Sequence, residues 1–469
     1  MLDSLVDKSL VLPRRTDLGT RFRLLEPVRQ YAERRLVEAG RDERARRAHA
    51  VHMARFVAEA SSGLRRHEQV DWRHRLDVDY DNVRAALRWL FAVGDLDRYL
   101  DVAFDLFSYW VHSGQQVEGI EICVAGAKAA GQTHAERAVK AWAVAAAMGA
   151  EITKPAAIEH ARAGLDLARG LGDPNTVGRL EAFLGAAIRH STTDEAYLGH
   201  LLEGRRLLDE HPEPRWWEAE WDSAFMNLIF GAYLPADDPR SGEHLEAALT
   251  TFERLGDKAM LAATLTETSG TYSAENGPRI IANLWRALEL LDEVHVPYWE
   301  GHARMILGML LELTGLPDEA AVHLEQAADQ LAEVGDMSCW ATSSRGAALC
   351  GAATGSADRG AGRAAAVIAE LPRLPMQEIA VPRTLDTAAT VLTALERFEE
   401  AAFVLGCAER TPFEVKTVLP RSARLEAVRA TLTDALPPEE FDRAWNEGAE
   451  TEPLECLAQA RDWLVAAAG

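Results

Sequence analysis

Cysteine and long apolar runs are both scarce in this chain of 469 residues. Its five cysteines are odd in number and form no CxxC pair, which argues against a disulfide framework or a zinc module. No apolar run approaches the roughly 20 residues that span a bilayer. The residues after Met1 do not form a basic and then apolar secretion signal. Together these absences predict a cytoplasmic protein that binds no membrane.

Motifs that carry catalysis are also missing. The sequence contains no GxxxxGK[ST] phosphate loop, no HExxH and no GxSxG. His49 and His52 lie three residues apart, but no third metal ligand accompanies them, so we interpret them as a surface or half-buried pair. We therefore expect a non-enzymatic protein without catalytic residues, cofactor or metal.

Positive charge is in deficit overall but not at the N-terminus. The chain has 50 Lys and Arg against 73 Asp and Glu, a net charge of −23, which argues against a nucleic-acid binder along its whole length. Residues 1–75 reverse this balance, with 17 basic and 11 acidic residues. The asymmetry suggests a domain boundary. Two interpretations remain open: a small basic module on an acidic body, or an Arg-rich amphipathic helix with a solvated face.

The first 40 residues predict a small mixed unit. Apolar patterning predicts a helix leading into a strand over residues 2–12 and an edge strand over 20–25, and turn residues predict a turn at 13–19 between them. A helix then follows over 27–40, which Pro27 begins and Gly40 ends. This order looks like the last helix and wing of a winged-helix domain whose first part is missing. Leu5, Val6, Leu10 and Phe22 would then lack part of their core. We expect this end to be mobile or to pair with another chain.

Beyond residue 75 the pattern is helical and repeats. The segments 171–173, 255–257 and 334–336 read Leu-Gly-Asp, Leu-Gly-Asp and Val-Gly-Asp, and each closes an amphipathic helix. Two further helical segments end at 210–211 and 294–295, between the first and second and between the second and third of these motifs. The five helix ends are then about 40 residues apart along the chain. Each unit is a helix, a turn, a helix and a turn. Small residues stand where two helices approach, as is typical of tetratricopeptide-like hairpins.

A single hairpin cannot bury its apolar face alone, so the repeats must stack. The predicted fold is therefore all-α: a tetratricopeptide-like right-handed superhelix of helical hairpins, with a small partial winged-helix segment at the N-terminus. We divide the chain into residues 1–75, the basic module; 76–371, the repeats; and 372–469, a C-terminal helical cap. Breaks are expected near 65–69 and within 371–382, where three prolines interrupt the pattern. Asp81 is predicted to cap the start of a helix.

An aromatic stretch is the one local oddity in the repeats. Its members are Trp216, Trp217, Trp221, Phe225, Phe230 and Tyr233. We place the stretch in the first helix of a repeat, where neighbouring residues point about 100° apart, so Trp216 and Trp217 cannot both face the core. One hypothesis is that Trp216, Trp217 or Trp221, together with Asn227, lines a groove for a peptide or small ligand. The other is that residues at 217, 221 and 225 form a buried stripe.

Three stretches together resemble one family. They are LVDKSLV at residues 5–11 with FRLLEPVRQYA at 22–32, DYDNVRAALRW at 79–89, and FDRAWNEG at 441–448. They resemble the region behind the ATPase in actinobacterial transcriptional regulators of the STAND class, including AfsR-like and LuxR-type proteins. The resemblance implies that the first stretch belongs to a winged-helix module, that the second opens the helical repeats, and that the third lies near their end.

The resemblance does not extend to the family's ATPase and DNA-binding domains, because no stretch of this sequence matches them. The family's ATPase would lie upstream of Leu5, and its DNA-binding domain would lie upstream of the ATPase or beyond the repeats. Neither activity can therefore be assigned to a residue of this sequence. We expect either a separately encoded or truncated piece, or a start that is internal to a longer gene. The implied role is that of a sensor and scaffold that restrains the ATPase until an effector or protein partner binds.

Two functions follow as hypotheses. The first is a non-enzymatic, protein-interaction and effector-sensing solenoid of a STAND-type regulator. Its partner would be an ATPase domain or a separate regulator, with a peptide or small-molecule effector, and DNA would be contacted only indirectly. The alternative is a direct DNA-binding regulator that uses the basic segment 14–75. Against it, the acidic remainder would repel DNA within a Debye length of about 10 Å at 0.1 M salt.

Overall fold

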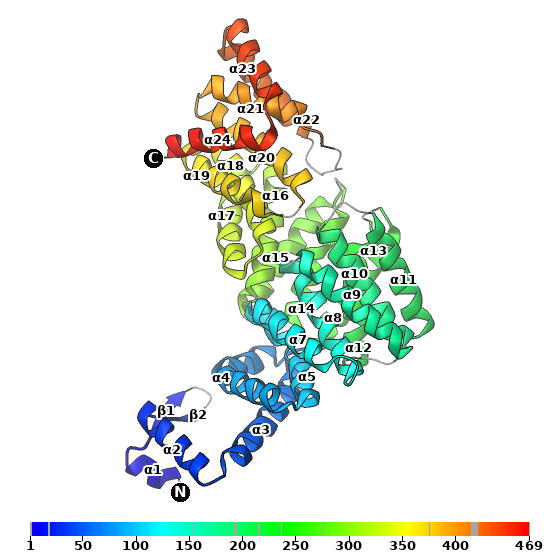
Figure 1. Cartoon of the computed structure of the whole chain (residues 1–469). Coiled ribbons are helices and arrows are strands. Elements are labelled where there is room, and N and C mark those ends of the chain that lie inside the picture. The colour runs from blue at the N-terminus through cyan, green and yellow to red at the C-terminus, as the bar shows by residue number, and fades with distance from the viewer. Residues whose placement is uncertain are drawn as a thin grey trace.

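The computed structural model describes residues 2–16, 19–152, 154–191, 195–213, 216–235, 237–273, 275–374, 376–413 and 421–468. Over these ranges the chain is an all-α superhelix of helical hairpins, with one small sheet near the N-terminus. In Figure 1 the sheet lies at one end of the molecule, the hairpins wind through the middle, and the last helices lie at the other end. No helix within these ranges is long and apolar enough to cross a bilayer.

The N-terminal unit contains helix α1, strands β1 and β2, and helices α2 and α3. Their bounds are Leu2–Asp7, Val11–Thr16, Gly19–Leu24, Glu26–Glu38 and Asp42–Gly63. The strands pair antiparallel, with Val11 opposite Leu24. The turn predicted at 13–19 was wrong in extent, because β1 continues through Pro13 to Thr16. Each strand of a two-stranded sheet has a free edge, so the missing N–H of proline removes no obligatory hydrogen bond. Asp17 and Leu18, within that predicted turn, lie outside the described residues.

Apolar side chains in this unit are poorly covered. Leu10 is 38% exposed and Phe22 is 45% exposed, while Leu5 and Val6 are half-buried. Helix α2 buries none of its residues, and its Tyr31 is 59% exposed. The prediction that these positions lack part of a core is thereby confirmed. Arg21 connects the sheet to the helix that contains Asp79: its guanidinium forms a bidentate ion pair with the Asp79 carboxylate, at 2.6 and 3.0 Å.

Four helices lead from this unit into the repeats: α4, α5, α6 and α7, with bounds Gln69–Val93, Leu96–Asp105, Phe107–Ser113 and Gln116–Ala130. The break predicted near 65–69 falls between α3 and α4, and one buried cluster runs across it from α3 into the later helices. The helix start predicted at Asp81 was wrong, because α4 is continuous from Gln69. Its buried positions Leu76, Tyr80 and Val83 keep the helical spacing through that point. Asp81 instead lies on the solvent face and pairs with Arg84.

Six helical hairpins follow. The first helices are α8 (Ala135–Ile152), α10 (Pro174–Ser191), α12 (Ala219–Tyr233), α14 (Lys258–Glu267), α16 (Pro297–Leu313) and α18 (Met337–Ala353). The second helices are α9 (Lys154–Leu171), α11 (Ala196–Glu210), α13 (Pro239–Leu255), α15 (Gly277–Val294), α17 (Pro317–Val334) and α19 (Ala357–Glu370). Short 3₁₀ turns follow α14 and α19, at Thr268–Thr271 and Leu371–Arg373.

The second helices end where the sequence period predicted. Helix α13 ends at Leu255, and Gly256 then adopts a φ of 73°, a left-handed conformation that glycine takes without strain. Asp257 next caps α14 by accepting a hydrogen bond from the Met260 amide. Gly335 and Asp336 perform the same two tasks between α17 and α18. The Gly-Asp pair is therefore a joint: it stops one helix and starts the next.

The C-terminal group comprises α20 (Gln377–Ala394), α21 (Phe398–Arg410), α22 (Arg421–Ala435), α23 (Pro438–Glu450) and α24 (Pro453–Ala468). It shares a buried cluster with α18 and α19, while a larger cluster runs from α3 to α18. The boundary predicted at 371–372 falls inside the smaller cluster. Of the three prolines expected to mark that break, Pro382 lies inside α20 and Pro375 lies outside the described residues.

Glycines allow α21 and α23 to cross closely. A Cβ added to Gly448 would lie 1.7 Å from the Phe403 carbonyl oxygen, and one added to Gly406 would lie 2.0 Å from the Trp445 carbonyl oxygen. Both contacts are with backbone, which cannot swing aside. The final glycine of the motif at 441–448 is therefore required by the distance between the two backbones.

We predict that Gly448→Ala separates α21 from α23 and destabilises the C-terminal group by about 1–3 kcal/mol or more, because the added methyl overlaps a carbonyl. Thermal unfolding followed by circular dichroism measures this. The control is Gly362→Ala in α19, where a Cβ meets only Ala468 at 3.9 Å. That variant is expected to be neutral or slightly stabilising. Equal melting temperatures for the two variants would contradict the close crossing.

Candidate functional site

The predicted aromatic stretch lies at the start of α12. Trp216 and Trp217 precede this helix, which begins at Ala219, so their placement in a helix was wrong. They are 8% and 9% exposed, and both are buried. Adjacent tryptophans can both face the core here, contrary to our expectation, because neighbours point about 100° apart only within a helix. In the irregular segment before α12 both side chains turn inward.

Trp217 and Trp221 belong to a continuous aromatic cluster. Trp217 stacks on Phe104 of α5, with ring centroids 5.1 Å apart, and meets the edge of Trp221 at the same distance. Trp221 stacks on Phe225 at 5.2 Å. The three residues at 217, 221 and 225 are all buried, as the stripe interpretation describes. Offset and edge-on ring pairs of this kind are the favoured geometries.

A buried ion pair fixes the start of α12. Arg179 of α10 contacts Asp222 at 2.7 Å, and their side chains are 2% and 1% exposed. Asp222 also accepts a hydrogen bond from the Trp216 backbone amide at 3.3 Å, and the Arg179 guanidinium lies over the Trp216 ring at 5.1 Å. Trp216 is thus held by charge and cation–π contacts within the protein.

Asn227 faces a different direction from the aromatic cluster. It is half-buried, and its Oδ1 lies 2.8 Å from Nδ1 of His244 on α13. It lines a depression with Arg205, Asp209 and Met226, and Arg179 and Asp222, which hold Trp216, line the same depression. The described residues of this lining include no tryptophan, so the structure does not place Asn227 and the tryptophans around one groove.

An apolar pocket opens on the inner face of the repeats, beside the cluster. The pocket is tight, with a cavity volume of about 40 Å³, and together with the open solvent at its mouth the space free of protein atoms is about 630 Å³. Six helices contribute mostly apolar side chains to the lining. The residues are Phe107 and Val111 of α6; Ala147, Met148 and Ala150 of α8; Phe183 and Ala186 of α10; Phe225, Leu228, Ile229, Ala232 and Tyr233 of α12; Met260 and Glu267 of α14; and Trp299 of α16.

The lining has a simple structural origin. Five of the six contributing helices are the first helices of consecutive hairpins, and the sixth, α6, comes from the N-terminal side and also contacts α16. Two parts of the chain that are far apart in sequence thereby meet across the pocket. Concave, mostly apolar pockets with a few polar groups are the usual sites for small molecules.

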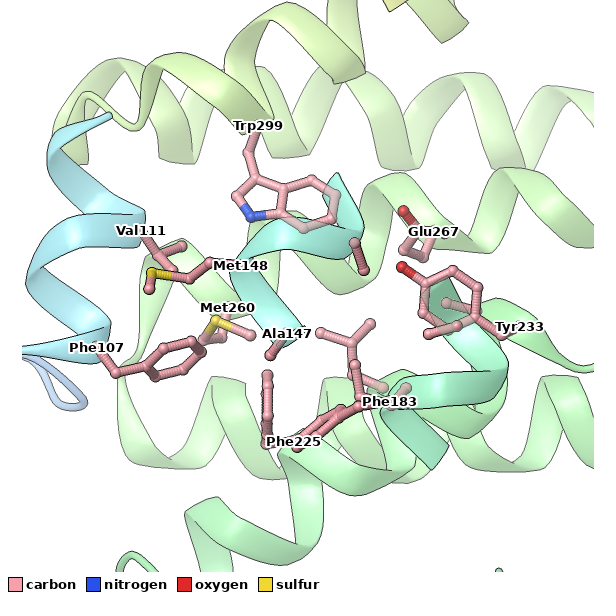
Figure 2. A pocket seen from close by; sticks show the side chains of 15 residues that line it. Phe107, Val111, Ala147, Met148, Phe183, Phe225, Tyr233, Met260, Glu267 and Trp299 are labelled. Carbon is pink, nitrogen blue, oxygen red and sulfur yellow. The ribbon is translucent and has the colours of Figure 1, made fainter. Parts of the chain in front are cut away.

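Among the described residues that line the pocket, Glu267 is the only charged one. Figure 2 shows its carboxyl near the Tyr233 hydroxyl, while Phe107, Val111, Met148 and Met260 lie at the other end of the pocket. Its side chain is 20% exposed, and burial raises the pKa of this carboxyl from 4.5 to about 7. Nδ1 of His302 on α16 lies 3.9 Å from Oε1 of Glu267.

Tyr233, the other polar group at that end, has its hydroxyl 2.9 Å from Nε2 of His190 on α10. Sequence reasoning included Phe225 and Tyr233 in the aromatic stretch but missed Glu267. A signal was present, because Glu267 is the single charged residue between Ala259 and Ser273.

The N-terminal helices are locked onto the same repeats. The Gln69 side chain of α4 donates to the Gly256 carbonyl at 3.2 Å and accepts from the Ala259 amide at 3.1 Å. Arg65 pairs with Glu218 at 3.0 Å. Arg73 donates to the carbonyl of Val294 at 2.6 Å and also to that of His295.

Arg65, Gln69 and Arg73 contact three successive positions along the repeats: the start of α12, the turn before α14, and the turn before α16. Sequence reasoning did not find these contacts, because their partners lie more than 150 residues apart.

Comparison with known proteins gives a partial match. No family model matches the chain. Over 227 residues it is 28% identical to proteins of Mycobacterium bovis and of two strains of Mycobacterium tuberculosis that are named as HTH-type transcriptional regulators. The match covers 45% of this chain and 25% of each relative, so the chain spans about a quarter of the length of these curated relatives. This chain is similar to part of each regulator.

Among solved structures, a circular tandem repeat protein with a novel repeat topology aligns over 91% of this chain and 97% of its own, at 14% identity. The TM-score is 0.18, which is too low for that likeness to carry an argument.

We predict that Asp222→Asn destabilises the repeats by about 3–5 kcal/mol, because it leaves the Arg179 guanidinium buried without a counter-charge. Denaturant unfolding monitored by tryptophan fluorescence measures this. Glu220→Gln, two residues away, breaks an exposed pair with Arg254. It is expected to cost at most about 1 kcal/mol. A cost for Asp222→Asn as small as the control's would show that the buried pair contributes little.

We also predict a pH-dependent gain in stability for Glu267→Gln. Because the folded protein raises the pKa of Glu267 from 4.5 to about 7, the carboxyl's contribution is complete below pH 4.5 and is lost as the pH rises through 7. Glutamine does not ionise, so the variant should match the parent near pH 5 and exceed it at pH 8 by about 2–3 kcal/mol. Thermal melts across this range measure the difference, with the exposed Glu289→Gln as control. Parallel curves for parent and Glu267→Gln from pH 5 to 8 would refute the shift.

Proposed function

We propose that this chain is the non-enzymatic, effector-sensing helical-repeat part of a transcriptional regulator of the STAND type. The observation that carries the proposal is the apolar pocket, because it lies where five successive repeats face a helix of the N-terminal side. Similarity to proteins named as HTH-type transcriptional regulators supports the regulatory setting. The stretches at 5–11, 22–32, 79–89 and 441–448 support the STAND assignment.

The mechanism is a shift between arrangements of the repeats and the N-terminal helices. A ligand in the pocket contacts α6 on one side and α8 to α16 on the other, so it binds one relative position of these helices more tightly than another. Gln69, Arg65 and Arg73 connect that position to α3 and α4, and Arg21 connects α4 to the sheet. The sheet and α2 then present a changed surface to a protein partner, an ATPase domain or a separate regulator.

The alternative, direct DNA binding by residues 14–75, finds little support in the surface of that segment. Several of its arginines are already paired with carboxylates: Arg21 with Asp79, Arg29 with Glu26, Arg35 with Glu38, and Arg46 with Glu33. Each such pair lowers the charge that would release counterions from a phosphate backbone.

A gel-shift titration decides between the two. We predict no shift of a mixed-sequence DNA duplex by the purified chain at micromolar concentration and 0.15 M salt. Micromolar binding that falls steeply with salt would favour the alternative.

We predict that a substitution that fills the pocket changes transcription in cells in the same way as deletion of the gene for this chain. Ala232→Phe adds a ring at a half-buried position that lines the pocket, so it should exclude the effector while the repeats remain folded. RNA sequencing of a deletion strain and of this variant is expected to reveal overlapping sets of altered transcripts. Ala458→Phe, at an exposed position of α24, is the matched control and should leave transcripts unchanged. If the deletion strain itself has unaltered transcripts, the proposal fails.

A further inference from the structure

We propose that the pocket binds an amphiphilic organic cation, whose amine or quaternary ammonium group pairs with Glu267 and whose apolar body fills the other end. This inference rests on the proposed function and adds the chemical class of the effector.

The two ends of the pocket differ in chemistry. At one end lie the Glu267 carboxyl and the Tyr233 hydroxyl; at the other lie Phe107, Val111 and two methionines (Figure 2). Flexible methionine side chains adapt to ligands of varied shape. A ligand that satisfies both ends must carry one polar head and a compact apolar body.

The polar end favours a cation over other heads. An acidic ligand would bring a second negative charge beside Glu267, and the described residues of the lining include no lysine or arginine to balance it. A sugar would need many hydrogen-bonding groups, but among the described lining residues Tyr233, Glu267 and Trp299 alone have side chains with polar atoms apart from the methionine sulfurs. Tyr233 and Trp299 also supply aromatic rings, and ring faces attract ammonium groups.

The unliganded carboxyl is poised to exchange a proton for such a head. Burial raises the pKa of Glu267 from 4.5 to about 7, so near neutral pH this carboxyl holds its proton far more often than an exposed one does. The titratable groups that face it are His302 on α16 and Tyr233 on α12, the latter bonded to His190. A bound ammonium group would stabilise the ionised carboxylate, and the carboxyl proton would leave to solvent.

The test compares 2-phenylethylamine, which is protonated at pH 7, with 2-phenylethanol, a neutral molecule of nearly the same shape. Titration calorimetry of the full chain at pH 7 gives both dissociation constants. Repeating the titrations in phosphate and in MOPS buffer gives the protons released, from the change in apparent enthalpy. The variants are Glu267→Gln, the charge-matched Glu289→Gln on α15, and the pocket-filling Ala232→Phe.

We expect the amine to bind at least tenfold more tightly than the alcohol and to release protons at pH 7, because the raised pKa of Glu267 leaves part of the free carboxyl protonated. Glu267→Gln should weaken the amine at least tenfold and leave the alcohol unchanged, while Glu289→Gln changes neither. Equal affinity for amine and alcohol, both abolished by Ala232→Phe, would overturn the cation inference but leave the pocket as an effector site. Absence of binding of both probes at millimolar concentration, or binding that survives Ala232→Phe, would count against the pocket itself.

Discussion

A single buried carboxylate, that of Asp257, joins three parts of this molecule. Its oxygens accept hydrogen bonds from the Trp221 indole at 2.8 Å and from the Met260 amide at 3.1 Å, and the Gln69 amide lies 3.5 Å away. The aromatic cluster, the start of α14 and the N-terminal helix α4 therefore share one anchor. Burial raises the pKa of Asp257 to about 6 even with these donors in place. An unpaired carboxylate at this depth would be costly, so the three donors must remain together.

Helix α6, which follows α5, forms one side of the pocket and contacts α16 on the opposite part of the chain. Alanines on α8, α10 and α12 leave space behind α6, and aromatic and methionine side chains surround that space. One acidic group, Glu267, remains within it.

The two ends of the superhelix are packed differently. At the C-terminal end, α21 and α23 cross at a distance that only glycine permits and α24 packs against α19, although Leu454 and Val465 of α24 are 51% and 57% exposed. At the N-terminal end, α2 buries nothing and the sheet leaves Leu12 42% and Leu24 39% exposed. Large apolar side chains are therefore exposed at both ends, and at the N-terminal end α2 in addition buries none of its residues.

The sequence by itself determined the features that depend on neighbours within one or two helical turns. The Gly-Asp joints at 256–257 and 335–336, the period of about 40 residues, and the helix opened at Pro27 were all readable, because caps and amphipathic stripes are local signals. The burial of both Trp216 and Trp217 was decided by tertiary structure, since Asp222, Arg179 and Phe104 draw an irregular segment inward. Tertiary structure also decided that Glu267 lies in a pocket. The lining residues, from Phe107 to Trp299, come together only when α16 packs against α6 in the folded superhelix. Spacing along the sequence gives no sign of this contact.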